Sequence, residues 1–286
     1  MKIFDSHAHL VSDNFDKYPP TPLSGTLDRK LDAPVTAEVL LKLMDEQGVD
    51  KAVAVQRAHV YGYNNEYVVD SANLYPDRLV SVCVIDAAAK DSAQTVKRWA
   101  GAGAVGMRLS EQTKGAGTDW LYSENALNAW SEVDRLGLSM CVHMYRWNRA
   151  EVLEKLVLLA AAFPRTKIVL DHLSNPIEES GGPDYGVDSA LLALQPFTNV
   201  YLKYSHINLA RMAKNEISSA AVILRVVADF GTHRIMWGSD VAQSAGTYEE
   251  MVNAAIAASS KLTEEQQLAV LHTTADAVYG GTWRKK

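Results

Sequence analysis

Eight short apolar runs, each followed by a longer segment, extend from one end of the sequence to the other. Most of these runs are apolar throughout rather than at alternate positions, which is typical of strands buried on both faces of a parallel sheet. Eight such strands, alternating with helical segments, predict an α/β protein with a (β/α)8 barrel, also called a TIM barrel. A doubly wound open sheet is the alternative that the same alternation permits. The runs span residues 2–10, 52–56, 79–86, 104–109, 138–144, 167–173, 200–205 and 235–240.

The segments between the runs carry the signals of helix ends. Thr36 precedes an apolar pattern of helical spacing at 38–44, and Gly48 follows it. A hydroxyl side chain caps the first turn of a helix, and glycine tolerates the left-handed turn that ends one. No repeat, low-complexity tract or linker divides the sequence, so we predict a single barrel domain over residues 1–286. Further helical patterns lie at 126–136, 151–163, 187–194, 217–230, 248–260 and 263–271.

Charge and cysteine content exclude several classes of function. The net charge of -6 argues against nucleic acid or acidic membrane surfaces as partners, because both attract basic patches. Cys83 and Cys141 each lie inside an apolar run, which predicts buried thiols in a reducing compartment. The first 20 residues are too polar for a secretory signal, and no run approaches the ~18 apolar residues of a membrane span. We therefore expect a soluble cytoplasmic protein. The sequence leaves its oligomeric state open, and a homo-oligomer is one of the possibilities.

Five polar side chains mark the ends of the predicted strands. His7 and His9 are two residues apart on one strand, so both rings point to the same side. The other three lie near the ends of the fifth, sixth and eighth runs, and the carboxyl ends of barrel strands share one mouth. Each alone has a simpler explanation, such as a core histidine or a helix cap, but together they predict a site for a zinc-like ion. The three are His143, His172 and Asp240.

The motifs at these strand ends resemble those of the amidohydrolase superfamily. They are DSHAH at 5–9, His143, DHLSNP at 171–176 and WGSD at 237–240. More narrowly, they resemble the branch of sugar lactonases and 2-pyrone-4,6-dicarboxylate lactonases. The resemblance spans the whole chain and includes the segments VQ at 55–56, YGYNN at 61–65 and GMR at 106–108.

The resemblance implies a metal site with at most one ion. By analogy, His7, His9 and Asp240 are the metal ligands and His143 is the fourth, with one divalent ion, zinc, as the cofactor. No lysine lies in the run at 104–109, so the carbamylated lysine of the binuclear members is absent. Some lactonases of this branch keep the same histidines and work without metal. The sequence does not separate these two cases.

The resemblance also implies a reaction, namely the opening of a lactone ring by water. Asp240 is then the general base that takes a proton from water, and His172 faces the water or the substrate carbonyl. A metal ion or an imidazolium would polarise that carbonyl. The expected partner is a small anionic or sugar-derived lactone.

Substrate binding is predicted from cationic and aromatic residues near strand ends. Arg108 and Arg146 would each bind a carboxylate through two hydrogen bonds, and Tyr61 matches a loop that contacts substrate in relatives. For each arginine the alternative is an ion pair with a loop carboxylate such as Glu111 or Glu178. Weaker candidates are Arg57, Lys203, Tyr204 and His206.

Two rival functions remain open from the sequence. One is a metal-dependent decarboxylase of an aromatic or muconate-like acid, which uses a similar set of ligands, although DHLSNP favours a lactonase. The other is a non-catalytic barrel that binds a small acid or a metal. The chain also departs from its relatives, because VAQS at 241–244 stands where the branch often has Trp-Pro after Gly-Ser-Asp. The substrate of any one relative is therefore an unsafe guide.

Overall fold

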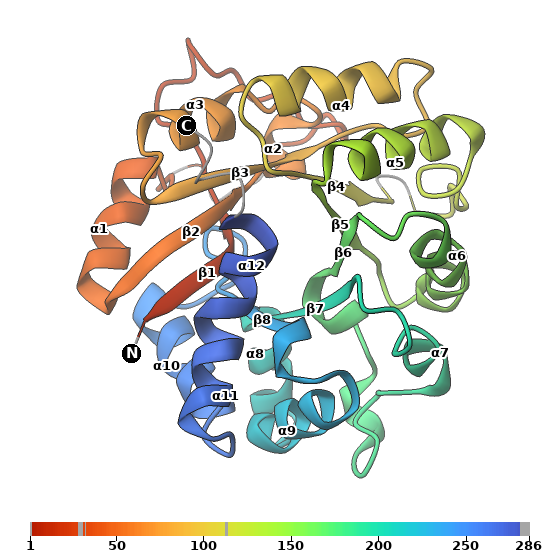
Figure 1. The fold of residues 1–286 in the computed structure, drawn as a ribbon. Helices are drawn as coiled ribbons and strands as arrows, with labels where there is room; N and C mark the ends of the chain where they lie inside the picture. The colour runs from red at the N-terminus through yellow and green to blue at the C-terminus, as the bar shows by residue number, and fades with distance from the viewer. Residues whose placement is uncertain (1, 28–30, 32, 112–113, 281–286) are drawn as a thin grey trace.

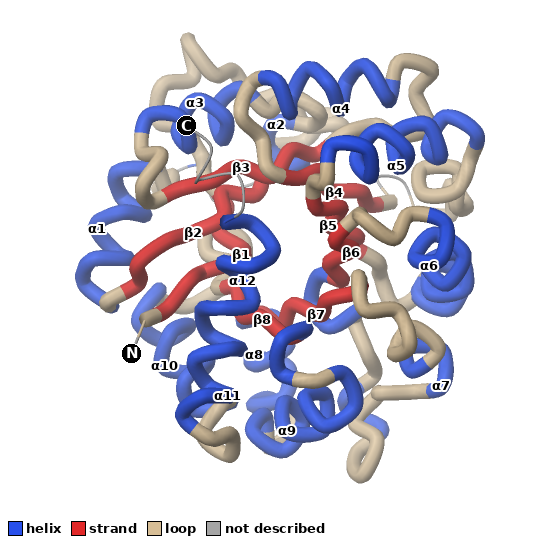
Figure 2. The backbone as a smooth tube through the Cα atoms, in the orientation of Figure 1, coloured by secondary structure: helices blue, strands red, loops and turns tan. Residues whose placement is uncertain are grey.

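The computed structural model describes residues 2–27, 31, 33–111 and 114–280 of the chain. Its eight strands form one parallel sheet in which each strand pairs with the next along the sequence. Figure 2 shows these strands as a ring with the helices outside it. All eight predicted strands are confirmed. They are β1 Ile3–His9, β2 Val49–Val55, β3 Leu79–Val84, β4 Gly106–Ser110, β5 Ser139–His143, β6 Lys167–Leu170, β7 Val200–Ser205 and β8 Ile235–Gly238.

The ring closes just beyond the carboxyl end of β8. The Asp240 N–H donates to the His7 carbonyl at 2.7 Å, and the His9 N–H donates to the Val241 carbonyl at 3.2 Å. Ala8 and Val241 form an isolated parallel bridge at the same point. These contacts join the last strand to the first, so the barrel prediction is confirmed and the open-sheet alternative is wrong.

Helices follow the strands around the outside of the ring (Figure 1). The helices predicted after β1, β4, β5 and β7 are present, with ends within a few residues of the prediction. The helices after β2 and β3, together with α8, had no counterpart in the prediction. The elements are α1 Ala37–Gln47, α2 Ala58–Tyr61, α3 Glu66–Leu74, α4 Ser92–Gly101, α5 Glu124–Leu136, α6 Arg149–Ala162, η2 Asp171–Ser174, η3 Glu178–Ser180, α7 Ser189–Leu192, α8 His206–Lys214, α9 Ser219–Phe230, η4 Thr232–Arg234, α10 Tyr248–Ala258, α11 Glu264–Leu268, the π-helical turn η5 Ala269–Thr273 and α12 Thr274–Tyr279.

The amino-terminal mouth of the barrel is filled by apolar side chains. Helix α12 lies against this end of the ring, as Figure 1 shows. Its Tyr279 packs in one cluster with Phe4, Val80 and Val105. Polar chemistry is therefore confined to the opposite, carboxyl-terminal mouth, which is where barrel enzymes carry their active sites.

Both cysteines are buried and free, as predicted. Cys83 belongs to the layer between strands and helices, and Cys141 belongs to the barrel interior. Burial raises the pKa of both thiols, so neither is a reactive thiolate at neutral pH. Within the described part of the chain, no helix combines the length and apolar character needed to cross a membrane.

Candidate active site

Asp5 fastens the first strand to the last and so sets the position of the histidines on β1. The pairing of β1 with β2 shifts register between Asp5 and Ala8, which marks a bulge. The buried Asp5 carboxylate accepts from the N–H of His7 at 3.0 Å and of Ser239 at 2.8 Å, and from the Tyr248 hydroxyl at 3.0 Å. The aspartate of the DSHAH motif therefore has a structural role.

Gly238 allows β8 to approach this bulge. A Cβ atom built on Gly238 would lie 2.4 Å from the His7 Cβ and 2.7 Å from the His7 nitrogen, well inside contact distance. Any larger residue would push the two strands apart at the point where the barrel closes. The glycine of the WGSD motif is therefore required by packing between strands.

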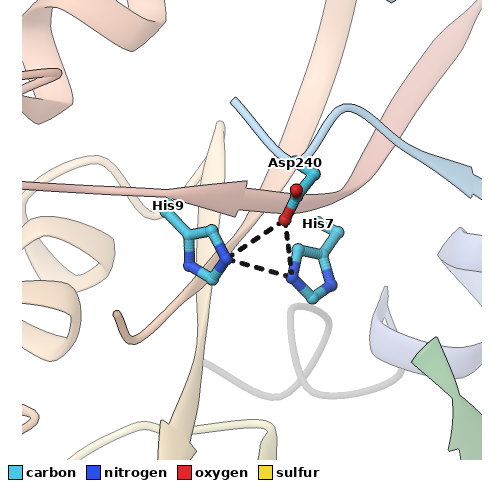
Figure 3. A group of neighbouring side chains, drawn as sticks. All are labelled: His7, His9 and Asp240. Carbon is cyan, nitrogen blue, oxygen red and sulfur yellow. Dashed lines mark hydrogen bonds and ion pairs between the residues drawn. The ribbon is translucent and has the colours of Figure 1, made fainter. Parts of the chain in front are cut away.

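His7, His9 and Asp240 converge at this closure, and we call them the seam cluster. The His7 Nε2 lies 3.3 Å from the His9 Nε2. The Asp240 Oδ1 lies 3.3 Å from the His9 Nε2 and 3.6 Å from the His7 Nε2. All three side chains are buried, and Figure 3 shows the three atoms facing one another. The structure thus brings together three of the four predicted metal ligands.

The seam cluster fits a divalent metal ion. The His9 Nδ1 lies 2.8 Å from the Val55 carbonyl, which only accepts, so a neutral His9 turns the lone pair of its Nε2 toward Asp240. Asp240 Oδ1 is buried and has no hydrogen-bond partner among the described residues. Ligands about 2.0–2.1 Å from a tetrahedral zinc ion stand roughly 3.3 Å apart, close to the spacing seen here. Either a metal ion or a proton between these two facing atoms would hold them together.

The Asp240 carboxylate is held ionised. Burial raises its pKa, but the contacts with His9 and His172 and the hydrogen bond from Ser244 outweigh this effect, and the net pKa lies below the usual value. The Ser244 hydroxyl donates to Oδ2 at 2.7 Å. The backbone of Asp240 is left-handed, with φ of 61°, a conformation that Asp tolerates better than most residues. The side chain is thereby turned into the mouth as an acceptor.

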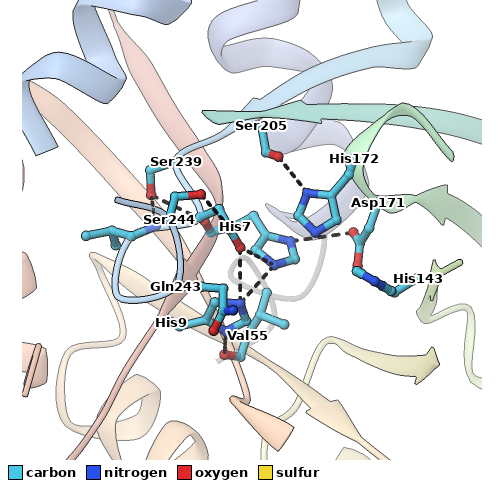
Figure 4. A network of polar contacts seen from close by, with 12 residues as sticks. His7, His9, Val55, His143, Asp171, His172, Ser205, Ser239, Gln243 and Ser244 are labelled. Atoms are coloured by element: carbon cyan, nitrogen blue, oxygen red, sulfur yellow. Dashed lines mark hydrogen bonds and ion pairs between the residues drawn. The ribbon is translucent and has the colours of Figure 1, made fainter. Parts of the chain in front are cut away.

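A second group of charged side chains occupies the other side of the mouth, from β4 to β7. We call Arg108, His143, Asp171, His172 and Lys203 the β4–β7 cluster; Figure 4 shows its His143, Asp171 and His172 beside His7. The Asp171 Oδ2 accepts from the Arg108 Nε at 2.7 Å, and its Oδ1 accepts from the Lys203 Nζ at 3.0 Å. Burial raises the pKa of Asp171, but Lys203, His7 and Arg108 together hold it well below the usual value. One carboxylate thus neutralises much of the charge of two buried cations.

His143 belongs to this second cluster and lies outside the three-atom group of the seam. Its Nδ1 accepts from the Arg108 Nη2 at 3.0 Å, because a guanidinium can only donate. Burial and then the charge of Arg108 lower the pKa of His143 to about 3, so the ring is neutral and carries its proton on Nε2. A protonated nitrogen offers no lone pair to a metal ion. The predicted fourth ligand therefore has another partner in this structure.

His172 is held in a strained turn after β6. Four consecutive residues, His172 to Asn175, have φ between 50° and 61°, in the left-handed region. This conformation costs roughly 1–2 kcal/mol for each non-glycine residue, so it persists only where the surroundings impose it. The Arg149 Nε donates to the Ser174 carbonyl at 3.0 Å, and the Asn175 side chain donates to the Met144 carbonyl at 2.6 Å. Strain of this kind is concentrated at functional sites.

A cavity of about 350 Å3 opens above both clusters. Its volume suits a single substituted ring. Two cationic side chains, Arg57 and Arg108, line it together with Asp240 and four histidines. The full lining is His9, Leu23, Ser24, Arg57, Ala58, His59, Arg108, Ser110, His143, Tyr145, His172, Asn175, Ile207, Asp240 and Gln243.

The chain matches a known protein family over almost its whole length. The family model described as Amidohydrolase matches residues 4–281. The chain belongs to the amidohydrolase family. Among proteins with a curated description, none matches this amidohydrolase significantly.

Solved structures with the same fold carry several activities in their names. A probable 2-pyrone-4,6-dicarboxylic acid hydrolase from Acinetobacter baumannii, with citric acid bound, has a TM-score of 0.77 and 21% identity over 98% of this chain and 100% of its own. A zinc-bound amidohydrolase from Burkholderia multivorans has a TM-score of 0.71 and 20% identity over 98% and 99%. The 5-carboxyvanillate decarboxylase of Novosphingobium aromaticivorans, with manganese and a nitrobenzoic acid, has a TM-score of 0.66 and 14% identity over 98% and 95%. At these identities the likeness concerns the fold alone.

Two of the three predicted substrate residues lie away from the cavity of this amidohydrolase. The Arg146 Nη2 lies 2.8 Å from a Glu178 carboxylate oxygen and 2.9 Å from one of Glu179, which is the ion-pair alternative. The buried Tyr61 accepts from the Ser12 N–H at 2.8 Å and so fastens the loop after β1. The described residues that line the cavity include Arg108 but neither of these two.

The structure adds residues that the motifs did not single out. Asp171 lies at the centre of the β4–β7 cluster, although it was read only as part of DHLSNP. The Ser205 hydroxyl forms a hydrogen bond with the His172 ring. The Gln243 side-chain oxygen accepts from the Arg57 Nε at 3.2 Å and Nη2 at 3.0 Å. The sequence could have indicated the two residues of β7. Lys203 and Ser205 are two positions apart on one strand, so their side chains point to the same side.

Proposed function

We propose that this amidohydrolase opens the ring of a lactone that carries a carboxylate group. The observation that carries the proposal is the position of Asp240, an ionised carboxylate at the floor of a cavity that Arg57 and Arg108 line. A base and cationic binding groups in one enclosed space are what hydrolysis of an anionic ester requires. The amidohydrolase family and the lactonase-like DHLSNP motif support the same conclusion.

Asp240 would act on the water molecule that attacks the ring. The pKa of its carboxyl lies below the usual value, so it is ready to accept a proton at neutral pH. Ser244 holds Oδ2, and Oδ1, which faces the His9 Nε2 at 3.3 Å, is the oxygen left to accept that proton. The same oxygen can return the proton to the leaving alkoxide when the ring bond breaks.

His172 and Arg108 would act on the substrate. Both line the cavity, His172 as a neutral imidazole and Arg108 as a fixed cation. Hydrogen bonds from these groups stabilise the negative charge that develops on the carbonyl oxygen in the transition state. A divalent ion held by the seam cluster would supply Lewis acidity and lower the pKa of water.

The charges around the cavity support an anionic substrate. Among the described residues that line it, Arg57 and Arg108 stand against one carboxylate, that of Asp240. The Arg57 guanidinium is almost fully buried, where attraction to an anion is stronger than in water. Citric acid in the Acinetobacter structure is a small carboxylate, which agrees with this class of ligand.

A screen of lactones tests the proposal. Purified protein is assayed on dicarboxylate and sugar-derived lactones, with and without chelator, and on carboxylated aromatic acids with detection of carbon dioxide. We expect ring opening of carboxylate-bearing lactones and no gas. Carbon dioxide release from the aromatic acids, without lactone opening, would contradict the lactonase and establish the decarboxylase. Binding of small acids without turnover of either class would instead support a non-catalytic barrel.

A further inference from the structure

Ser205 lies at the junction of β7 and α8 and contacts the ring of His172. Its Oγ forms a hydrogen bond with the His172 Nδ1, and both residues are buried. Because the His172 ring lines the cavity, the nitrogen left for substrate is Nε2. The direction of the hydrogen bond at Nδ1 therefore decides whether His172 offers the cavity a donor or a lone pair.

The helix that Ser205 caps favours one direction. Ser205 is the N-cap of α8 and forms a capping box with Asn208, whose Oδ1 accepts from the Ser205 N–H at 3.1 Å. The return contact, from the Asn208 N–H to the Ser205 Oγ, falls short of a full hydrogen bond. The oxygen nevertheless faces the positive end of the helix, which attracts its lone pairs. The hydroxyl hydrogen is thereby turned away from the helix, toward the His172 Nδ1.

The balance of donors and acceptors favours the same direction. Among the described residues, His172 Nδ1 is the one side-chain partner of the Ser205 hydroxyl. If Nδ1 carried the proton and donated to Oγ, the hydroxyl hydrogen would be buried without an acceptor, which is costly. If the hydroxyl donates to Nδ1, both groups are satisfied.

We propose that Ser205 is a positioning residue that donates its hydroxyl hydrogen to the His172 Nδ1 and so fixes the tautomer with the proton on Nε2. His172 then offers the cavity a hydrogen-bond donor, suited to the carbonyl oxygen of a bound ester. In this tautomer its Nε2 is neither a base nor a metal ligand, so proton transfer is left to Asp240. Only the link to turnover rests on the proposed function.

The same capping box also holds the backbone of the strained turn. The Asn208 Nδ2 donates to the His172 carbonyl at 3.0 Å and to the Glu178 Oε1 at 3.1 Å. Ring and backbone are thus fixed from one side by the first turn of α8.

Nitrogen NMR of protein labelled in its histidine rings tests the tautomer directly. Signals of His172 are assigned as those lost in the His172→Gln variant. We expect a protonated Nε2 and an unprotonated Nδ1 in the wild type, and a smaller population protonated at Nε2 in Ser205→Ala. A wild-type ring protonated at Nδ1 would overturn the proposal, whatever the substrate proves to be.

Kinetics on the lactone identified by the screen test the functional consequence. We expect Ser205→Ala to lower kcat roughly 10–100-fold, the usual effect of losing a partner that orients a site residue, with little change in KM. Ser205→Thr keeps the hydroxyl and should restore most of the rate. Ser123→Ala is the matched control, because Ser123 also caps a helix, accepting from the Ala126 N–H at 3.2 Å, outside the cavity lining.

The outcomes separate the two proposals. A loss of kcat in Ser205→Ala no greater than in Ser123→Ala overturns the positioning role, and so does failure of Ser205→Thr to recover activity while its NMR tautomer is intact. Absence of lactone turnover in the wild type contradicts the proposed function only. The tautomer assignment then still supports or overturns the proposal for Ser205.

Discussion

The two sides of the barrel mouth differ in the arrangement of their charged side chains. The seam cluster gathers two imidazoles and a carboxylate whose ligand atoms face one another. The β4–β7 cluster gathers two cations around one carboxylate, which leaves positive charge in excess. One side of the cavity therefore attracts positive charge, and the other tolerates negative charge.

This difference suits a reaction in which positive charge is held on one side of the substrate and negative charge develops on the other. A proton or metal ion belongs at the seam, next to the base that activates water. A carbonyl oxygen or carboxylate belongs at the opposite side, near buried donors that cannot relax away from it. The bulge of β1 and the strained turn after β6 hold the two sides in place, so the field across the cavity is preorganised.

Replacing the base at the seam should have the largest effect. Asp240→Asn removes the proton acceptor, and we expect kcat to fall by about 10²–10⁴, the typical contribution of general base catalysis. The fold should persist, because the backbone hydrogen bond to His7 is kept and Asn tolerates the left-handed conformation. Turnover and thermal unfolding are measured together. Asp229→Asn, which breaks a surface pair with Arg225, is the control, and near-normal hydrolysis by Asp240→Asn would remove the base from the proposal.

Metal affinity should divide the two sides. His9→Gln removes a seam ligand and should weaken zinc binding by at least the roughly 10–100-fold seen when an outer partner of a ligand is lost. His143→Gln should leave the affinity unchanged, because that ring accepts from Arg108 and carries its proton on Nε2. Competition with a chromophoric chelator measures both. Equal loss in the two variants would extend the metal site across the mouth and end the distinction.

The seam was predictable because strand geometry alone creates it. Residues at the carboxyl ends of parallel strands meet at one rim, and alternation puts His7 and His9 on the same side. Asp240 follows β8, the neighbour of β1 in a closed ring. No knowledge of side-chain partners was needed to bring these three together.

The other side was less predictable because its contacts depend on which side chains meet across strands. Arg108 pairs with Asp171, 63 positions away, and the motif DHLSNP does not reveal that pairing. His143 was predicted to bind the metal because the sequence does not reveal its contact with Arg108 either. Helices α3 and α4 were missed although their N-cap residues, Asn65 and Asp91, are of the types that favour helix starts.

Two arginines that look alike in the sequence should give the smallest effects and the sharpest contrast. Arg108 lies on β4 and lines the cavity, whereas Arg146 follows β5 and is paired with Glu178 and Glu179. We expect Arg108→Met to raise KM for an anionic lactone about tenfold or more, the worth of a hydrogen bond to a charged group, with a smaller change for a neutral sugar lactone.

Arg146→Met is the matched control and should leave both KM values unchanged. Arg108→Met also removes one of the two cations that contact Asp171 and leaves Lys203 as the other. Steady-state kinetics on the two substrates are therefore combined with thermal unfolding of each variant, which separates substrate binding from folding. Equal effects of Arg108→Met on both lactones would take Arg108 out of the substrate site. A shift in KM for Arg146→Met as large as that for Arg108→Met would mean that the loop after β5 reaches the substrate, and this side of the mouth would then extend beyond the β4–β7 cluster.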